Sequence, residues 1–288
     1  MDENVDKLAR TQHGLTDQQK RDIAITDYKQ LASCQFCFRT PEKSTGQKAS
    51  LEPPEIPIIS IGTQVYLGLP STEPLVPGHC LIIPTQHTVS TLTCEDDAWT
   101  EIRNFMKCLI HAFDARDEGA VFMETVTDVS GRKGRHTAIE CIPVPRDLYA
   151  DLPAYFKEGL LDADDEWTQH RKIIDTTINT SSPSAEDTGR SGLTRRTGGF
   201  RRSMTAKVPY FHLWTDLDGG MGHVIENNQL FPHYFGKQII AGMLDLPPKS
   251  YRKPARVPSN PSLERRRVRE FKERTNWAKF DWTQLLDK

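Results

Sequence analysis

The sequence contains no long apolar run: nowhere do its 288 residues approach the roughly 20 consecutive apolar positions that a membrane-spanning helix requires. Its first ten residues, MDENVDKLAR, are polar and acidic and lack the pattern of a secretory signal peptide. These absences argue against a membrane protein and predict an intracellular protein, in which thiols stay reduced. The six cysteines are therefore expected to bind metal or to pack in the core rather than to form disulfides.

The sequence also has little net charge, −2, and no internal repeat. Its charges are unevenly placed, since acidic residues gather at 162–166 and basic residues at 249–279. A hydrophobic fraction of 37% and a charged fraction of 26% exclude a fully disordered chain and suit folded parts that carry polar linkers or arms. The length allows roughly two domains of ordinary size.

Apolar periodicity predicts an α+β protein. The clearest helix covers 99–113, where apolar residues recur every three or four positions and form one stripe. Residues 179–203 hold few large apolar side chains and many Ser, Thr, Gly and Arg residues, which predicts a flexible linker. The Pro-rich, basic end is expected to form an arm. Further helices are expected over 16–33, 153–171 and 231–244, and strands over 58–61, 64–69, 79–84, 120–125, 136–144 and 210–214.

Two cysteines separated by two residues, Cys34 and Cys37, can offer both sulfurs to one ion from a single turn. Zinc in a structural site prefers a closed tetrahedron of thiolates and imidazoles. Two later histidines suit the remaining positions, because His87 follows a strand-ending proline and His136 opens a predicted strand. On chemistry alone His79 rivals His87, and a buried cysteine pair with no metal also explains the motif.

The order of these residues resembles the zinc-bearing branch of the histidine-triad (HIT) fold over about 34–145. The C-x-x-C motif is followed by GHCLIIPTQH at 78–87, by the amphipathic helix, and by a strand that opens with histidine and reaches Ile-Pro. The resemblance implies an antiparallel sheet with helices, stapled by a structural Zn²⁺. Carried across residue by residue, the ligands are Cys34, Cys37, His87 and His136. The resemblance thus selects His87 over His79.

The catalytic residues of a HIT enzyme are incomplete in this sequence. Such an enzyme attacks a phosphorus atom with the middle histidine of an alternating triad, whose members share one face of a strand. The corresponding face here carries His136, Ala138 and Glu140, and alanine cannot act as a nucleophile. Glu140 opposes phosphate binding unless Lys133 or Arg135 compensates. We therefore predict a pseudo-enzyme, with a HIT-type nucleotide hydrolase or transferase as the alternative.

A second block closely resembles the second C-terminal domain of CwfJ-like proteins, and the first block is similar to the first domain of that family, which tends to lose the triad. The resemblance rests on VPYFHLW at 208–214, DGGMGHVIE at 218–226, FPHYFG at 231–236 and GMLDL at 242–246. The implied organisation is an N-terminal segment with a helix over 1–33, a zinc-bearing HIT-like domain over 34–178, a linker over 179–203, and a smaller mixed α/β domain with a basic tail over 204–288.

The CwfJ resemblance implies a nuclear, non-enzymatic pre-mRNA splicing factor of late or post-catalytic spliceosomes that hold the excised intron lariat. Its partners would be spliceosomal proteins and snRNA or intron lariat RNA, with no membrane, and it would promote lariat turnover or spliceosome disassembly. A regulator of the lariat debranching enzyme is a further alternative. The side chains predicted to bind RNA or a protein partner are Lys133, Arg135, Arg265, Arg266, Arg267, Arg269, Lys272, Trp277 and Trp282.

Overall fold

The computed structural model describes residues 33–39, 52–130, 135–163, 170–177, 179–180, 196–197, 199–215, 217 and 219–286. The helix predicted over 16–33, except for Ser33, and the loop residue Lys133 lie outside these described residues.

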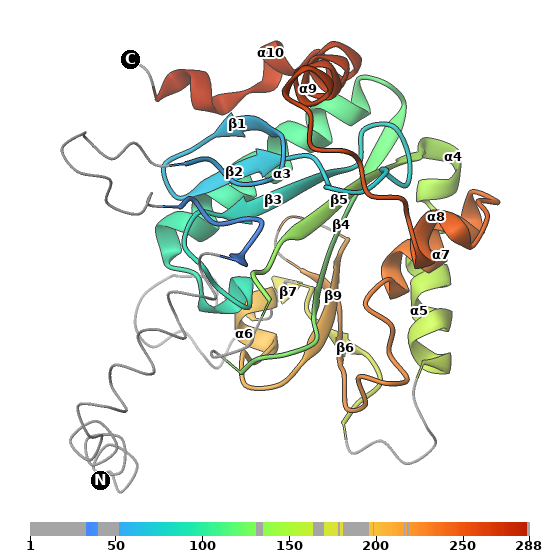
Figure 1. The fold of residues 1–288 in the computed structure, drawn as a ribbon. Helices are drawn as coiled ribbons and strands as arrows, with labels where there is room; N and C mark the ends of the chain where they lie inside the picture. Colours follow the sequence, from blue (N-terminus) through green and yellow to red (C-terminus); the bar gives the residue numbers. More distant parts are fainter. Residues whose placement is uncertain are drawn as a thin grey trace, which may run out of the picture.

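One antiparallel sheet of eight strands forms the centre of the fold (Figure 1). Across the sheet the order is β1 (Ile58–Ile61), β2 (Val65–Gly68), β3 (Cys80–Pro84), β5 (Ile139–Pro145), β4 (Glu118–Val126), β9 (Tyr210–Trp214), β10 (Gly220–Val224) and β6 (Ile174–Asp175). Every pair of neighbours is antiparallel. A separate two-stranded ribbon joins β7 (Asn179–Thr180) to β8 (Arg196–Thr197).

The sheet is covered on both faces. Its central strands therefore carry apolar side chains on both sides. In β3 all five residues are buried. Cys80 and Ile82 face one core, whereas Leu81 and Ile83 face another. Alternate residues of a strand point to opposite faces, so a continuous apolar run predicts coverage of both.

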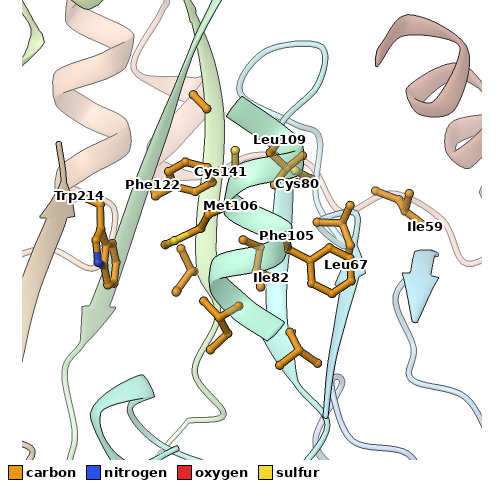
Figure 2. Packing of buried hydrophobic residues seen from close by; sticks show 14 of the residues in the cluster. Ile59, Leu67, Cys80, Ile82, Phe105, Met106, Leu109, Phe122, Cys141 and Trp214 are labelled. Carbon is orange, nitrogen blue, oxygen red and sulfur yellow. The ribbon is translucent and has the colours of Figure 1, made fainter. Parts of the chain in front are cut away.

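The first face is covered by α3 (Asp96–Asp114), the helix with the predicted apolar stripe. Figure 2 shows Phe105, Met106 and Leu109 of this helix among Ile82 and Cys141 of the sheet. Burying one such large apolar side chain stabilises the fold by about 1.5–3 kcal/mol. Acidic residues occupy the first turn of α3, where the helix dipole favours negative charge. Among the described residues, no helix combines the length and the apolar character needed to cross a membrane.

The second face is covered by α5 (Leu152–Asp162) and α7 (Phe235–Met243), with the short helices α4 (Arg146–Tyr149) and α8 (Lys249–Arg252) beside them (Figure 1). Phe156 of α5 stacks on Phe211 of β9 at 6.0 Å between ring centroids. A Cβ at Gly159 would lie 2.8 Å from Ile239 Cδ1, so glycine permits the close approach of α5 to α7. The helix predicted over 153–171 is shorter than expected, because α5 ends at Asp162.

The basic C-terminal residues fold as helices on the sheet rather than as an extended arm, which corrects the prediction. They form α9 (Pro261–Thr275), α10 (Trp277–Phe280) and the 3₁₀ helix η2 (Trp282–Leu285). The Asn260 side chain caps α9 by accepting from the backbone N–H of Ser262 at 2.9 Å. Phe271 and Trp277 are buried in the same core as α3. Their burial holds the helices in place.

The predicted linker contributes to the core at its described end. In α6 (Phe200–Ser203), Phe200 is 1% exposed and packs 4.4 Å from the ring of His212 and 5.6 Å from that of Trp99. Residues 199–203 are therefore not a flexible linker. The linker was predicted from the average composition of 179–203, and such an average does not reveal one buried aromatic residue. The sheet also runs through both predicted domains, since β9, β10 and β6 continue it beyond β4.

Candidate metal centre

The C-x-x-C turn lies across the end of β2, where the hydroxyl of Tyr66 donates to the carbonyl oxygen of Phe36 at 2.7 Å. The backbone N–H of Glu55 donates to the carbonyl oxygen of Gln35 at 3.0 Å. The first bond ties the turn to β2, and the second ties it to the segment that leads into β1. Cys37 is buried and Cys34 is partly buried.

The two histidines come from the same end of the neighbouring strands β3 and β5. Ile82 pairs with Ile139, so the residues that follow β3 and those that precede β5 lie side by side. His87 lies three residues beyond the end of β3, and His136 lies three residues before β5 begins. His136 is thus outside the strand that was predicted to start with it. The two imidazole centroids are 4.8 Å apart.

The structure brings Cys34, Cys37, His87 and His136 together, with one ligand atom from each lying within 4.8 Å of the others. The Sγ atom of Cys37 lies 3.3 Å from His87 Nδ1 and 3.4 Å from His136 Nδ1. The Sγ atom of Cys34 lies 3.5 Å from His136 Nδ1. A tetrahedral ion with bonds of about 2.3 Å to sulfur and about 2.0–2.1 Å to nitrogen separates these atoms by about 3.5 Å. The four residues therefore fit around one metal ion.

One hydrogen bond sets the tautomer of His136. Its Nε2 lies 2.9 Å from the carbonyl oxygen of Pro84, and because a carbonyl only accepts, Nε2 carries the proton. The Nδ1 lone pair of His136 is left facing the two sulfurs. Ligand histidines in metal sites use the same arrangement to orient the ring.

A hydrogen bond between the two thiols moves their pKa values in opposite directions. The hydrogen bond from Cys37 lowers the pKa of Cys34 to about 3, burial opposes this shift, and His136 adds to it. The same hydrogen bond raises the pKa of Cys37, because losing that proton would place two negative charges side by side. A divalent cation would replace the remaining proton, since thiolates rather than thiols bind metals.

His79, the rival ligand, lies outside this cluster. Its side chain is 4% exposed, and its Nδ1 accepts from the backbone N–H of Leu75 at 3.3 Å. Burial lowers the pKa of His79 to about 4, so the ring is neutral near pH 7. The geometry therefore supports His87 over His79 as the third residue of the cluster.

A buried carboxylate that sequence reasoning missed, Glu124, ties the two histidine-bearing segments together. It is 1% exposed and accepts from Thr91 Oγ1 at 2.6 Å, Thr137 Oγ1 at 2.5 Å and the Tyr210 hydroxyl at 2.7 Å. Thr137 follows His136, and its N–H donates to the carbonyl oxygen of Thr88, which follows His87. Burial raises the pKa of Glu124, against the effect of these hydrogen bonds. The sequence signal that could have revealed Glu124 is its position as the single acidic residue in the predicted apolar strand 120–125.

The face that was predicted to correspond to the catalytic triad opens, at Ala138 and Glu140, on a cleft of about 880 Å³. Its Glu140 forms an ion pair with Lys237 of α7 at 2.7 Å. Burial alone would raise the pKa of Glu140, but Lys237, together with His79 and His233, outweighs burial and lowers that pKa. The sequence offered Lys133 and Arg135 as residues that could compensate the charge of Glu140. Lys237 pairs with Glu140, Arg135 lies exposed in the same cleft, and Lys133 lies outside the described residues.

The other predicted binding residues fall into two groups. Trp277 is fully buried, with its Nε1 donating to Ser60 Oγ at 2.7 Å, and Trp282 packs edge-on against Phe105. Arg267 donates to the carbonyl oxygen of Pro70 at 2.9 Å. These three side chains make contacts within the fold, and the full burial of Trp277 corrects the prediction that it binds RNA or a protein partner. The remaining residues are exposed on α9, and they are Arg265, Arg266, Arg269 and Lys272.

The fold and the site define a class of protein: an antiparallel α/β protein with a Cys₂His₂ cluster. Two family models match the chain, "Protein similar to CwfJ C-terminal" over 22–157 and "Protein similar to CwfJ C-terminus 2" over 166–283. The chain belongs to the CwfJ-like family.

Curated relatives extend this finding. The chain is 40% identical over 235 residues to the pre-mRNA-splicing factor cwf19 of Schizosaccharomyces pombe, covering 81% of this chain and 34% of that protein. It is 35% identical over 274 residues to CWF19-like protein 2 of Danio rerio, covering 94% and 25%. For CWF19-like protein 2 of Homo sapiens the identity is 34% over 278 residues, covering 95% and 27%. The chain thus spans about a third or less of the length of these relatives.

Proposed function

We propose that this chain acts as a non-enzymatic pre-mRNA splicing factor in the nucleus, within late or post-catalytic spliceosomes that hold the excised intron lariat. The observation that carries the proposal is its 40% identity to a protein named as a pre-mRNA-splicing factor, together with the match to both CwfJ family models. In this role the chain binds protein and RNA partners and promotes lariat turnover or spliceosome disassembly.

The metal in this proposal is a structural Zn²⁺ bound by Cys34, Cys37, His87 and His136. Two thiolates and two imidazoles fill the tetrahedron that zinc prefers and leave no position for a reacting water, as in structural rather than catalytic sites. The ion would fasten the C-x-x-C turn to the segments that flank β3 and β5. This staple supports the assignment of residues 34–178 to a HIT-like domain.

The absence of catalysis is supported by the face beside the metal cluster. Ala138 stands where a HIT enzyme has its nucleophile, and Glu140 is engaged by Lys237 at 2.7 Å. This pair places a carboxylate where such an enzyme binds a phosphate. The alternative, a nucleotide hydrolase or transferase, predicts turnover of a nucleotide phosphoramidate or a capped nucleotide by the purified chain.

Partner binding is supported by the exposed cations of α9 and by Arg135 in the cleft. Contacts of such side chains with phosphates are insensitive to sequence and weaken as salt concentration rises. The further alternative, a regulator of the lariat debranching enzyme, uses the same surfaces. It predicts that the chain changes the rate of debranching by that separate enzyme.

Affinity purification of the tagged chain from nuclear extract, with its bound RNA sequenced and its proteins identified, tests the proposal. We expect late spliceosomal proteins with U2, U5 and U6 RNA and excised introns. The Cys34→Ser variant should recover less of this assembly, and Cys108→Ser is the matched control because Cys108 lies outside the cluster. Recovery of the free chain, together with turnover of a nucleotide phosphoramidate, would contradict the proposal and favour the enzyme.

A further inference from the structure

A tyrosine of β9 reaches the buried carboxylate that lies beside the metal cluster. β9 pairs antiparallel with β4, and Tyr210 of β9 stands opposite Val126 of β4 (Figure 1). The Tyr210 hydroxyl donates to Glu124 Oε2 at 2.7 Å, and neither of these two side chains is more than 1% exposed. The pairing of two distant segments therefore forms this hydrogen bond in the core.

The carboxylate of Glu124 holds both of the segments that carry the histidines. Its Oε1 atom accepts from the backbone N–H of Thr91 at 2.9 Å and from Thr137 Oγ1 at 2.5 Å. Thr137 directly follows His136, and Thr91 lies four residues beyond His87. Because one oxygen binds both segments, a rotation of this carboxylate would move the two histidines relative to each other.

The Tyr210 hydroxyl opposes that rotation by binding the second oxygen. Its proton goes to Glu124 Oε2, which also accepts from Thr91 Oγ1 at 2.6 Å. The hydroxyl oxygen of Tyr210 therefore accepts from Ser90 Oγ, at 2.7 Å, and Ser90 is fully buried. The ring of Phe200 packs against that of Tyr210 at 6.0 Å between centroids. Hydrogen bonding and packing thus hold Tyr210 in the orientation in which it binds Glu124.

The residues of this network come from two different family regions. Glu124 and all four residues of the metal cluster lie in the region matched over 22–157. Tyr210 lies in the region matched over 166–283. The first region therefore contains every ligand, yet one hydrogen bond that supports the ligands comes from the second.

We propose that Tyr210 is a positioning residue of the metal centre, so that the second family region sets the metal affinity of a site whose ligands all lie in the first. Tyr210 acts through Glu124, which keeps His87 and His136 at the spacing that one ion requires. Groups that hold metal ligands in place in this way raise the affinity of the site. The inference rests on the proposed Zn²⁺ of the cluster and adds its dependence on the second region.

The test measures the zinc affinity of the purified full chain by competition with a chromophoric chelator. Tyr210→Phe removes only the hydroxyl and should raise the dissociation constant for zinc about tenfold, the lower end of the range for groups that orient metal ligands. Thr91→Val, which removes another donor to Glu124, should also weaken zinc binding. In a chain that already carries Glu124→Gln, Tyr210→Phe should have little further effect, because the two residues act in one network.

The matched control is Tyr149→Phe. It removes a hydroxyl that donates to the carbonyl oxygen of Ala120 at 3.4 Å, outside this network. The zinc affinity of this control should equal that of the wild type. Melting curves of the metal-free chains should show every variant folded at the temperature of the titration.

A purely structural role for Tyr210 predicts a different result. Tyr210→Phe would then lower the Tm of the metal-free chain and leave the dissociation constant for zinc unchanged, which would overturn this inference alone. An equal loss of affinity in Tyr149→Phe would overturn it as well. A wild type that binds no zinc would overturn the proposed metal and this inference together.

Discussion

Removal of the metal from the Cys34, Cys37, His87 and His136 cluster should lower the stability of the whole fold. The ligands come from three separate segments, and the ion binds the folded chain but not the unfolded one. If free Zn²⁺ exceeds its dissociation constant about a thousandfold, binding contributes about 4 kcal/mol to the free energy of unfolding. For a chain of this size that corresponds to a loss of roughly 8–16 °C in Tm on chelation.

The assay is a thermal melt with and without a chelator, paired with zinc analysis by mass spectrometry. Cys34→Ser should bind less zinc, melt near the temperature of the chelated wild type, and no longer respond to the chelator. Cys108→Ser, a change at a partly buried cysteine outside the cluster, should keep the zinc and the response. A wild type that binds zinc yet melts at the same temperature after chelation would show that the ion does not stabilise the fold.

Three further predictions follow from buried groups. Glu124→Gln places an amide where Thr91, Thr137 and Tyr210 donate, and it should lower the free energy of unfolding by about 1–3 kcal/mol. It should also weaken zinc affinity by about 10–100-fold in a competition titration. Unchanged zinc affinity would show that Glu124 does not position the metal ligands. Burial lowers the pKa of His79 to about 4, so between about pH 6.5 and 4 only the unfolded chain binds this proton, and stability falls as the pH drops through that window. His79→Gln should remove about 3 kcal/mol of that fall in urea titrations at the two pH values, and an unaltered slope would contradict it. Phe200→Ala should cost about 3–5 kcal/mol, whereas a linker residue would cost almost nothing.

Local signals in the sequence predicted correctly those helices and strands that keep the same side buried along their whole length. The strands at 58–61 and 210–214 match β1 and β9, and the helical stripe at 99–113 lies within α3. A period of two or of 3.6 residues reflects which side of an element is buried, and the neighbours do not alter it. The CwfJ-like family is confirmed by the two family models.

The errors arose where tertiary contacts outweigh composition. α9 begins with Asn260 as cap and Pro261 in its first turn, a helix-start signal that the surrounding prolines and charges obscured. Glu124 and Lys237 depend on the pairing of distant segments, which no local pattern encodes. The cysteine spacing predicted two ligands by chemistry, whereas the choice between His79 and His87 required either a resemblance or the register of β3 against β5.

X-ray absorption at the zinc edge of the purified chain distinguishes a closed structural ion from a catalytic one. We expect one zinc per chain with two sulfur ligands at about 2.3 Å and two nitrogen ligands at about 2.0–2.1 Å. The Cys37→Ser variant should lose this signal. An ion with only three protein ligands and a bound water, or no zinc in the chain, would contradict a closed structural site.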